Sequence, residues 1–145
     1  MNVSQAEKDE TIKGGEIISK MLAAEGVETV FGIADSSISA LCASLKSSGI
    51  KLISPTHETN AMHMAGAYAR ITGHLGVCIA GKGPGLANAL SGVAVENAEG
   101  HRVLLISGAA EVDNPDYNPK GTYRYLPQLD ATRPITKWNG AVSSP

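Results

Sequence analysis

Residues 51–107, KLISPTHETNAMHMAGAYARITGHLGVCIAGKGPGLANALSGVAVENAEGHRVLLIS, decide the fold. Short apolar segments alternate here with longer segments of helical periodicity: the predicted strands are 51–54, 77–80 and 103–107, and the predicted helices are 59–72 and 86–98. Short strands that alternate with such helices indicate βαβ units with right-handed crossovers. We therefore predict an α/β fold, a parallel sheet with helices on both faces.

The same alternation continues on both sides of this stretch. Toward the N-terminus, the predicted elements are a helix from its N-cap Thr11 to Gly26, a strand at 27–31, and a helix from the turn at 32–36 to Gly49. Toward the C-terminus, they are a long irregular segment at 108–127 and a last short strand at 135–138. Residues 1–10 are polar and unpatterned, so we expect a flexible tail there and one domain at 11–145.

The composition excludes several classes of protein. A chain of 145 residues with 43% hydrophobic residues can bury a core of its own. The charged fraction is 18% and the net charge is −2, which does not provide the basic stripe that nucleic-acid binding requires. No apolar run approaches the roughly 20 residues that span a bilayer, and the N-terminus has no secretory signal pattern. We expect a soluble, cytoplasmic protein without nucleic-acid or membrane partners.

The cysteines and histidines give no sign of a metal site. Cys42 and Cys78 fall in a helical and a strand pattern, where we expect reduced thiols in the core. The histidines, at positions 57, 63, 74 and 101, do not have the spacing of metal ligands. We interpret all of them except His57, which precedes a carboxylate in a turn, as structural or surface residues.

Three strand-to-helix turns are the first places to search for chemistry, because parallel α/β sheets bind ligands at the carboxyl ends of their strands. These turns are residues 32–37, 55–60 and 81–88. The second places Glu58 at the start of an Ala-rich helix. A carboxylate there stabilises the helix dipole by about 0.3–1 kcal/mol, or it serves as a catalytic group. The pattern alone leaves both interpretations open.

The third turn, GKGPG at residues 81–85, is rich in glycine and opens a helix. It matches neither the phosphate loop G-x-x-x-x-G-K-[ST] nor the dinucleotide motif G-x-G-x-x-G. A Gly-Pro-Gly turn is typical of a rigid wall that lets backbone approach a flat ligand, and also of a plain tight turn. A flavodoxin-like or dinucleotide-binding domain is disfavoured for the same reason.

Four segments together resemble a known family: GGEIISKMLAAEGVETVFGI (14–33), HETNAMHMAGAYARITG (57–73), GKGPGLANALSGVAVENAEGHRVLLISG (81–108) and RPITKW (133–138). The resemblance is to the N-terminal pyrimidine-binding domain of thiamine-diphosphate enzymes of the acetolactate synthase, benzoylformate decarboxylase and 2-hydroxyacyl-CoA lyase group. It covers nearly all of the chain after residue 13. It implies that Glu58 activates the cofactor through a pyrimidine ring nitrogen. It also implies that Gly83, Pro84, Gly85 and Asn88 line the cofactor pocket.

The resemblance also places a substrate opening near Asp35, Ser36, Lys82 and Arg124. Many relatives have Pro-Gly in place of Ala34-Asp35, a small residue or serine in place of Lys82, and a glutamine in place of Arg124. The arginine suggests recognition of a carboxylate or phosphate. The alternatives are that Ser36 caps the next helix, that Asp35 and Lys82 pair with each other or are solvated, and that Arg124 is a surface residue.

The family holds magnesium and the diphosphate on a separate domain that carries a Gly-Asp-Gly segment, and this sequence contains no such segment. The resemblance therefore implies Mg²⁺ and a diphosphate-binding domain or subunit as partners, and a small 2-oxo acid, aldehyde or acyl-CoA as substrate. The reaction would make or break a C–C bond next to a carbonyl. We expect a chain truncated before the central and diphosphate-binding domains, or one subunit of a split decarboxylase, and in both cases no activity in isolation.

A non-catalytic binding or assembly module that keeps the fold is the competing function. The Ala- and Gly-rich helical segments 61–69 and 86–94 also bear on assembly, because they carry few charges. We expect them to be covered by a second copy of the chain in a homo-oligomer. The alternative is that they pack on the sheet of their own chain and leave a monomer.

Overall fold

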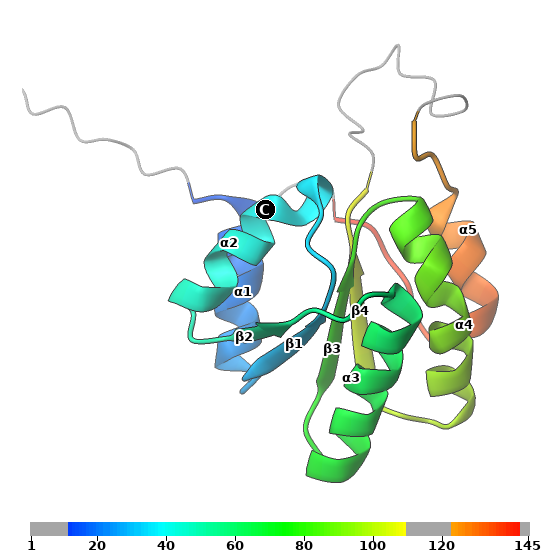
Figure 1. Ribbon diagram of the computed structural model, residues 1–145, viewed down its shortest axis with the longest axis horizontal. Coiled ribbons are helices and arrows are strands. Elements are labelled where there is room, and N and C mark those ends of the chain that lie inside the picture. Colours follow the sequence, from blue (N-terminus) through cyan, green and yellow to red (C-terminus); the bar gives the residue numbers. More distant parts are fainter. Residues whose placement is uncertain (1–11, 110–122, 143–145) are drawn as a thin grey trace, which may run out of the picture.

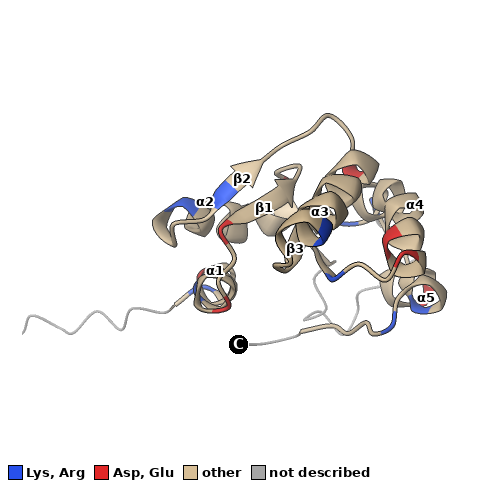
Figure 2. Cartoon of the chain, turned by 90° about the horizontal axis from the view of Figure 1, so that it is seen from below, with Lys and Arg blue, Asp and Glu red and all other residues tan. Residues whose placement is uncertain are grey.

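The structure is a computed structural model that describes residues 12–109 and 123–142. The predicted tail at 1–10 and most of the predicted irregular segment at 108–127 lie outside the described residues. The predicted N-cap Thr11 is wrong, because the first helix begins at Gly14 and its N-cap is Lys13. In the described part of the chain, no helix is long and apolar enough to cross a membrane. Figure 2 shows basic and acidic residues interspersed over the described elements.

Four parallel strands form one sheet (Figure 1). In the order β2-β1-β3-β4, they are β2 (Lys51–Ile53), β1 (Thr29–Gly32), β3 (Gly76–Ala80) and β4 (Val103–Ser107). Val30 of β1 stands opposite Leu52 of β2 and Val77 of β3, and Cys78 stands opposite Leu105 of β4. The predicted parallel sheet is confirmed, although β1 begins two residues later than predicted.

Helices cover both faces of this sheet, as predicted. They are α1 (Gly14–Ala24), α2 (Ser39–Ser47), α3 (Glu58–Thr72), α4 (Pro84–Ala98) and α5 (Gln128–Thr132), with 3-10 turns η1 (Ser36–Ile38) and η2 (Arg133–Ile135). Side chains of α1 and α2 pack with Val77 and Ile79 of β3. Side chains of α3 and α4 pack with Cys78, the β3 residue that lies between Val77 and Ile79 in the sequence. Alternate residues of one strand therefore enter two separate cores.

Two helices end at glycines, as the sequence predicts. Gly26 and Gly49 stand just past α1 and α2 with φ of +77° and +76°. This left-handed backbone costs glycine little and other residues more, so the helices stop there. The predicted free thiols are also present: Cys78 is buried and Cys42 is half-buried. Burial raises the pKa of the Cys78 thiol to about 12.

The predicted strand at 135–138 is wrong. Residues Arg133–Ile135 form the 3-10 turn η2, which continues from the unpredicted helix α5, and Thr136 Oγ1 donates a hydrogen bond to the Thr132 carbonyl. Proline at the start of η2 favours a helical turn because its N–H would have no partner there. Ile135 packs against the α3–α4 core, whereas Trp138 is 75% exposed. Of the two apolar residues in segment 135–138, only Ile135 packs against the core, so this segment does not have the buried face that a strand requires.

The small residues of α3 and α4 serve the chain's own packing. Ala61, Ala65 and Ala89 are each 0% exposed, in the core shared with Phe31 of β1. This agrees with the alternative in which these helices pack on their own sheet. Ala87 remains exposed. The homo-oligomer stays a prediction.

We predict that Gly92→Ala lowers the free energy of unfolding by about 1–3 kcal/mol, because overpacking a helix contact costs that much. A methyl group at this position would lie 2.5 Å from Met62 Cβ and 3.2 Å from the Thr59 carbonyl oxygen. Gly14→Ala is the matched control, because its methyl group would meet nothing within 4 Å. Urea unfolding followed by circular dichroism measures both variants. Equal stabilities for the two would contradict the close approach of α3 and α4.

Candidate functional site at the carboxyl edge of the sheet

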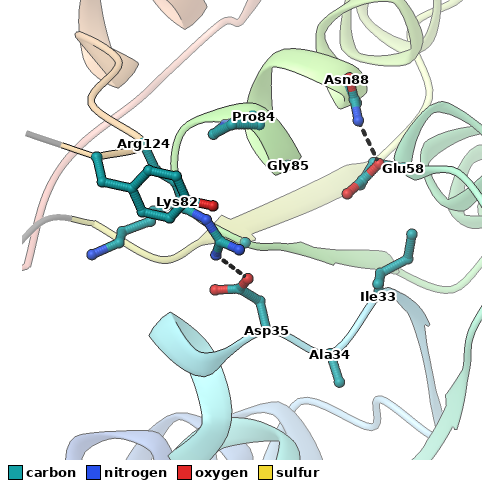
Figure 3. A pocket seen from close by; sticks show the side chains of 11 residues that line it. Ile33, Ala34, Asp35, Glu58, Lys82, Pro84, Gly85, Asn88 and Arg124 are labelled. Carbon is teal, nitrogen blue, oxygen red and sulfur yellow. Dashed lines mark hydrogen bonds and ion pairs between the residues drawn. The ribbon is translucent and has the colours of Figure 1, made fainter.

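A cavity of about 240 Å³ lies where the three turns singled out from the sequence meet (Figure 3). It is lined by Ile33, Ala34, Asp35, Glu58, Gly81, Lys82, Pro84, Gly85, Asn88, Tyr123 and Arg124. The turns follow β1, β2 and β3, whose carboxyl ends share one edge because the strands are parallel. The topology thus brings together most of the residues that the sequence suggested.

Glu58 is the first residue of α3, and its half-buried carboxyl group borders the cavity. Asn88 Nδ2 of α4 donates a hydrogen bond to Glu58 Oε2 at 3.0 Å. The other oxygen, Oε1, has no hydrogen-bond donor among the described residues, and Figure 3 shows the carboxyl group directed toward the hollow. Glu58 therefore has one oxygen that accepts a hydrogen bond from Asn88 and one that faces the cavity without a donor from the described residues.

The position of Glu58 is fixed by its neighbours. His57 is the N-cap of α3, and its Nδ1 accepts a hydrogen bond from the Thr59 backbone N–H at 3.2 Å. Thr59 Oγ1 donates to the backbone carbonyl of Asn88, which ties the first turn of α3 to α4. Because His57 provides the cap, the Glu58 carboxylate is not needed for that purpose. Glu58 also lies in the first turn of α3, where a carboxylate stabilises the helix dipole, so the position of Glu58 fits both that interpretation and a catalytic role.

The Gly-Pro-Gly turn is shaped largely by contacts within the chain. Gly83 has φ of +64°, and a methyl group there would overlap the carbonyl of Arg124. A methyl group at Gly81 would lie 2.6 Å from Asp35 Cγ. At Gly85 the nearest atom is Glu58 Oε1, 3.4 Å from the position of such a methyl group. Of the three glycines, Gly85 is thus the one that keeps open the space beside Glu58.

Asp35 and Arg124 form an ion pair on the opposite side of the cavity from Glu58 (Figure 3). Arg124 Nη1 lies 2.6 Å from Asp35 Oδ2, and the guanidinium carbon lies 5.2 Å from the centre of the Tyr123 ring. Asp35 Oδ1 accepts hydrogen bonds from the Ser37 backbone N–H at 2.9 Å and the Ser37 hydroxyl at 2.7 Å. These Ser37 hydrogen bonds, and then Arg124, hold the pKa of Asp35 below its usual 3.8.

The two remaining candidates for substrate binding are Lys82 and Ser36, and only Lys82 lines the cavity. Lys82 lines the cavity, and its ammonium group extends away from Glu58 (Figure 3). Its backbone N–H donates to Ser37 Oγ at 3.1 Å. Ser36 is exposed and is not among the residues that line the cavity. The cap of η1 is supplied by Asp35 rather than Ser36.

Sequence reasoning missed three residues of this site. Ser37 orients Asp35, and Tyr123 lies beneath the Arg124 guanidinium. Gln128 accepts a hydrogen bond from the Gly83 backbone N–H at 3.2 Å and donates one to the Gly108 carbonyl at 2.9 Å. The Asp-x-Ser spacing of Asp35 and Ser37 is a recognisable cap signal. Nothing in the sequence indicates the bonds of Gln128, because their partners are 45 and 20 residues away.

Comparison with known proteins gives one family. The model described as "Thiamine pyrophosphate enzyme, N-terminal TPP binding domain" matches residues 12–131. The catabolic acetolactate synthase of Raoultella terrigena is 42% identical over 131 residues, which are 90% of this chain and 23% of that protein. The human 2-hydroxyacyl-CoA lyase 1 is 32% identical over 136 residues, 94% of this chain and 23% of that protein. The acetolactate synthase of Bacillus subtilis is 35% identical over 130 residues, 90% of this chain and 22% of that protein. The chain spans less than a quarter of each relative.

We predict that Ser37→Ala raises the pKa of Asp35 toward 3.8, because the hydroxyl hydrogen bond is the largest cause of the lowered value. A lowered pKa stabilises the folded state above the unfolded value, and that contribution is lost as pH falls through the folded value. The variant should therefore lose less stability on acidification below about pH 4. Carboxyl ¹³C titration by NMR measures the pKa directly. Ser36→Ala is the matched control, and an unchanged Asp35 pKa in Ser37→Ala would contradict the assignment.

Proposed function

The chain belongs to the thiamine pyrophosphate enzymes as an N-terminal TPP binding domain, and we propose that its cavity holds the pyrimidine ring of thiamine diphosphate, with Glu58 as the cofactor-activating carboxylate. The observation that carries this proposal is the Glu58–Asn88 pair. It leaves one carboxyl oxygen facing the cavity without a donor from the described chain.

The residues present fit one ring of the cofactor. The cavity of about 240 Å³ is smaller than sites that enclose a whole drug-sized ligand, which measure about 300–1,000 Å³. Gly85 leaves room beside Glu58 Oε1, and Pro84 and Ile33 add apolar walls. A flat ring with a nitrogen at its edge suits a site with one free carboxyl oxygen between such walls. We propose contacts with the pyrimidine for Pro84, Gly85 and Asn88, which line the cavity. Gly83, also suggested by the sequence, is not among the lining residues and lies against the Arg124 carbonyl, so we assign it to the shape of the turn.

When bound, thiamine diphosphate supplies the electron sink for making or breaking a C–C bond next to a carbonyl. The task of Glu58 is to share a proton with a ring nitrogen through Oε1. Asn88 holds Oε2 and so fixes the direction of that hydrogen bond. The Glu58–Asn88 pair in a formed cavity favours this catalytic role over a non-catalytic module.

We propose that other domains or subunits complete the enzyme. Among the described residues, no three His, Cys, Asp or Glu side chains are grouped to hold a metal ion. Mg²⁺ and the diphosphate would be held by a partner domain, so the isolated chain would not turn over substrate. The complete enzyme would be a cytoplasmic lyase, transferase or decarboxylase that acts as a homo-oligomer on a 2-oxo acid, an aldehyde or an acyl-CoA.

We propose that Arg124 and Lys82 recognise an anionic group of the substrate. Both line the cavity, and among the described residues Asp35 forms an ion pair with Arg124. Lys82 has no ion-pair partner among the described residues, so this end of the cavity holds one unpaired cation, whereas the second carboxylate, Glu58, lies on the opposite side. A substrate carboxylate or phosphate would replace Asp35 as an acceptor for the guanidinium. Ser36 is left out of this proposal because it lies off the cavity.

In the assembled enzyme, Glu58→Gln should slow hydrogen–deuterium exchange at the thiazolium carbon and substrate turnover together, by about 10²–10⁴-fold. The amide keeps the shape of the side chain but does not share a proton as a carboxyl group does. Acid-quenched NMR of the cofactor measures the exchange, and the exposed Glu99→Gln serves as control. Normal exchange in Glu58→Gln, or turnover by the isolated chain, would overturn the proposal.

Arg124→Ala should lower kcat/KM for a substrate with a carboxylate or phosphate by about 10–100-fold, because hydrogen bonds to charged groups contribute about 1.5–3 kcal/mol. The value for an uncharged aldehyde should stay within about twofold. Arg133→Ala is the matched control, since Arg133 is 71% exposed and, within residues 12–109 and 123–142, pairs with Asp130 alone. A uniform loss with both substrates would indicate that Arg124 shapes the cavity without recognising charge.

A further inference from the structure

A second hollow, of about 420 Å³, lies on α3 and α4 away from the carboxyl-edge cavity. It is lined by His63, Ala67, Arg70, Ile71, Glu96 and His101, and shares no lining residue with the first cavity. Three parts of the chain contribute to it: α3, α4 and the segment that leads into β4. The proposed cofactor chemistry uses none of these residues.

Glu96 is the buried anchor of this hollow. It is only 5% exposed, and carboxylates are rarely buried unless they are paired. Its Oε1 lies 2.8 Å from His63 Nδ1, and its Oε2 lies 2.6 Å from His101 Nδ1. The carboxyl group rests on Gly66, where any side chain would overlap it. Glu96 of α4 is therefore enclosed by residues from two other segments, α3 and the segment before β4.

The pairing determines which ring nitrogens remain available. Because Glu96 accepts at both oxygens, the Nδ1 atom of each histidine carries a proton that it donates to the carboxylate. Among the described residues, Nε2 of His63 and Nε2 of His101 have no hydrogen-bond partner. In a neutral ring Nε2 accepts a hydrogen bond, and in a protonated ring it donates one.

Arg70 gives the hollow a permanent positive charge. Within residues 12–109 and 123–142, it has no Asp or Glu at ion-pair distance, and both oxygens of Glu96 are already engaged by the histidines. The nearby Arg102 donates to the carbonyl of Gly73 instead. The Glu96 carboxylate is engaged at both oxygens by the histidines, so the charge without a partner among the described residues is that of Arg70, which favours an anion over a metal ion.

We propose that Arg70, His63 and His101 bind a phosphate group, either of free phosphate or of a phosphate monoester. A phosphate accepts hydrogen bonds from the guanidinium. A dianionic phosphate also accepts from Nε2 of a protonated histidine, whereas a phosphate that keeps one O–H donates it to Nε2 of a neutral histidine. Ala67 and Ile71 form the apolar wall, and Ile71 is 82% exposed. That wall suits the alkyl part of a monoester.

The test is an NMR titration of the purified chain, in which the histidine ring carbons and protons are followed at constant pH and ionic strength. The probes are inorganic phosphate and n-butyl phosphate. We expect saturable shifts for His63 and His101, with little change for His57 and His74, which lie outside the hollow. If a monoester is the ligand, n-butyl phosphate saturates at a lower concentration than inorganic phosphate, and Ile71→Ala removes that difference. If free phosphate is the ligand, both probes saturate alike.

Arg70→Ala should weaken binding of both probes by at least about tenfold, a loss within the range for charge-assisted hydrogen bonds. Arg133→Ala, at another exposed arginine, should leave it unchanged. Shifts that never saturate, that include all four histidines equally, or that persist in Arg70→Ala would overturn the proposal. Saturation of the same signals by Zn²⁺ with no response to phosphate would also overturn it and would indicate a metal site.

Discussion

The complete burial of β3 is the constraint on which the structure depends. All five residues of this strand are buried, and it pairs with β1 on one side and β4 on the other. Its alternate side chains enter two cores, one with α1 and α2 and one with α3 and α4. Since β1 and β3 are parallel neighbours, the turns that follow them leave the sheet at the same edge. The cavity exists because that edge brings Asp35 and Gly81 together.

The charged groups of the cavity matter for their position more than for stability. The side chains of Asp35 and Arg124 are 18% and 30% exposed, and pairs that water reaches contribute about 0–1 kcal/mol. Arg124 also holds a φ of +66°, which a residue with a side chain rarely adopts. Its carbonyl lies where a side chain at Gly83 would be, so this approach requires glycine at position 83. The chain thus places a guanidinium at the cavity through contacts that add little to its stability.

The sequence predicts what depends on local pattern and fails where distant partners decide. Amphipathic periodicity and glycine stops located α1 to α4, and strand order placed Glu58, Gly85 and Asn88 together. The segment at 135–138 failed because its outcome depends on whether a neighbouring strand pairs with it, and Pro134 instead continues a helical turn. The Asp35–Arg124 pair spans 89 residues, so no local signal contains it. Ser36 is a candidate only through the family resemblance, and its alternative role as a helix cap is wrong because Asp35 is the N-cap of η1.

Three carboxylates, Asp35, Glu58 and Glu96, differ in how many of their oxygens are bonded within the described chain, and this difference supports the proposal that Glu58 is the reactive one. Asp35 accepts hydrogen bonds from Ser37 at one oxygen and from Arg124 at the other. Glu96 pairs with one histidine at each oxygen. Both are therefore committed to partners in the protein. Glu58 alone of the three keeps an oxygen without a donor from the described chain, directed into a cavity. A carboxyl group that is held at one oxygen and free at the other can exchange a proton with a ligand while its orientation stays fixed.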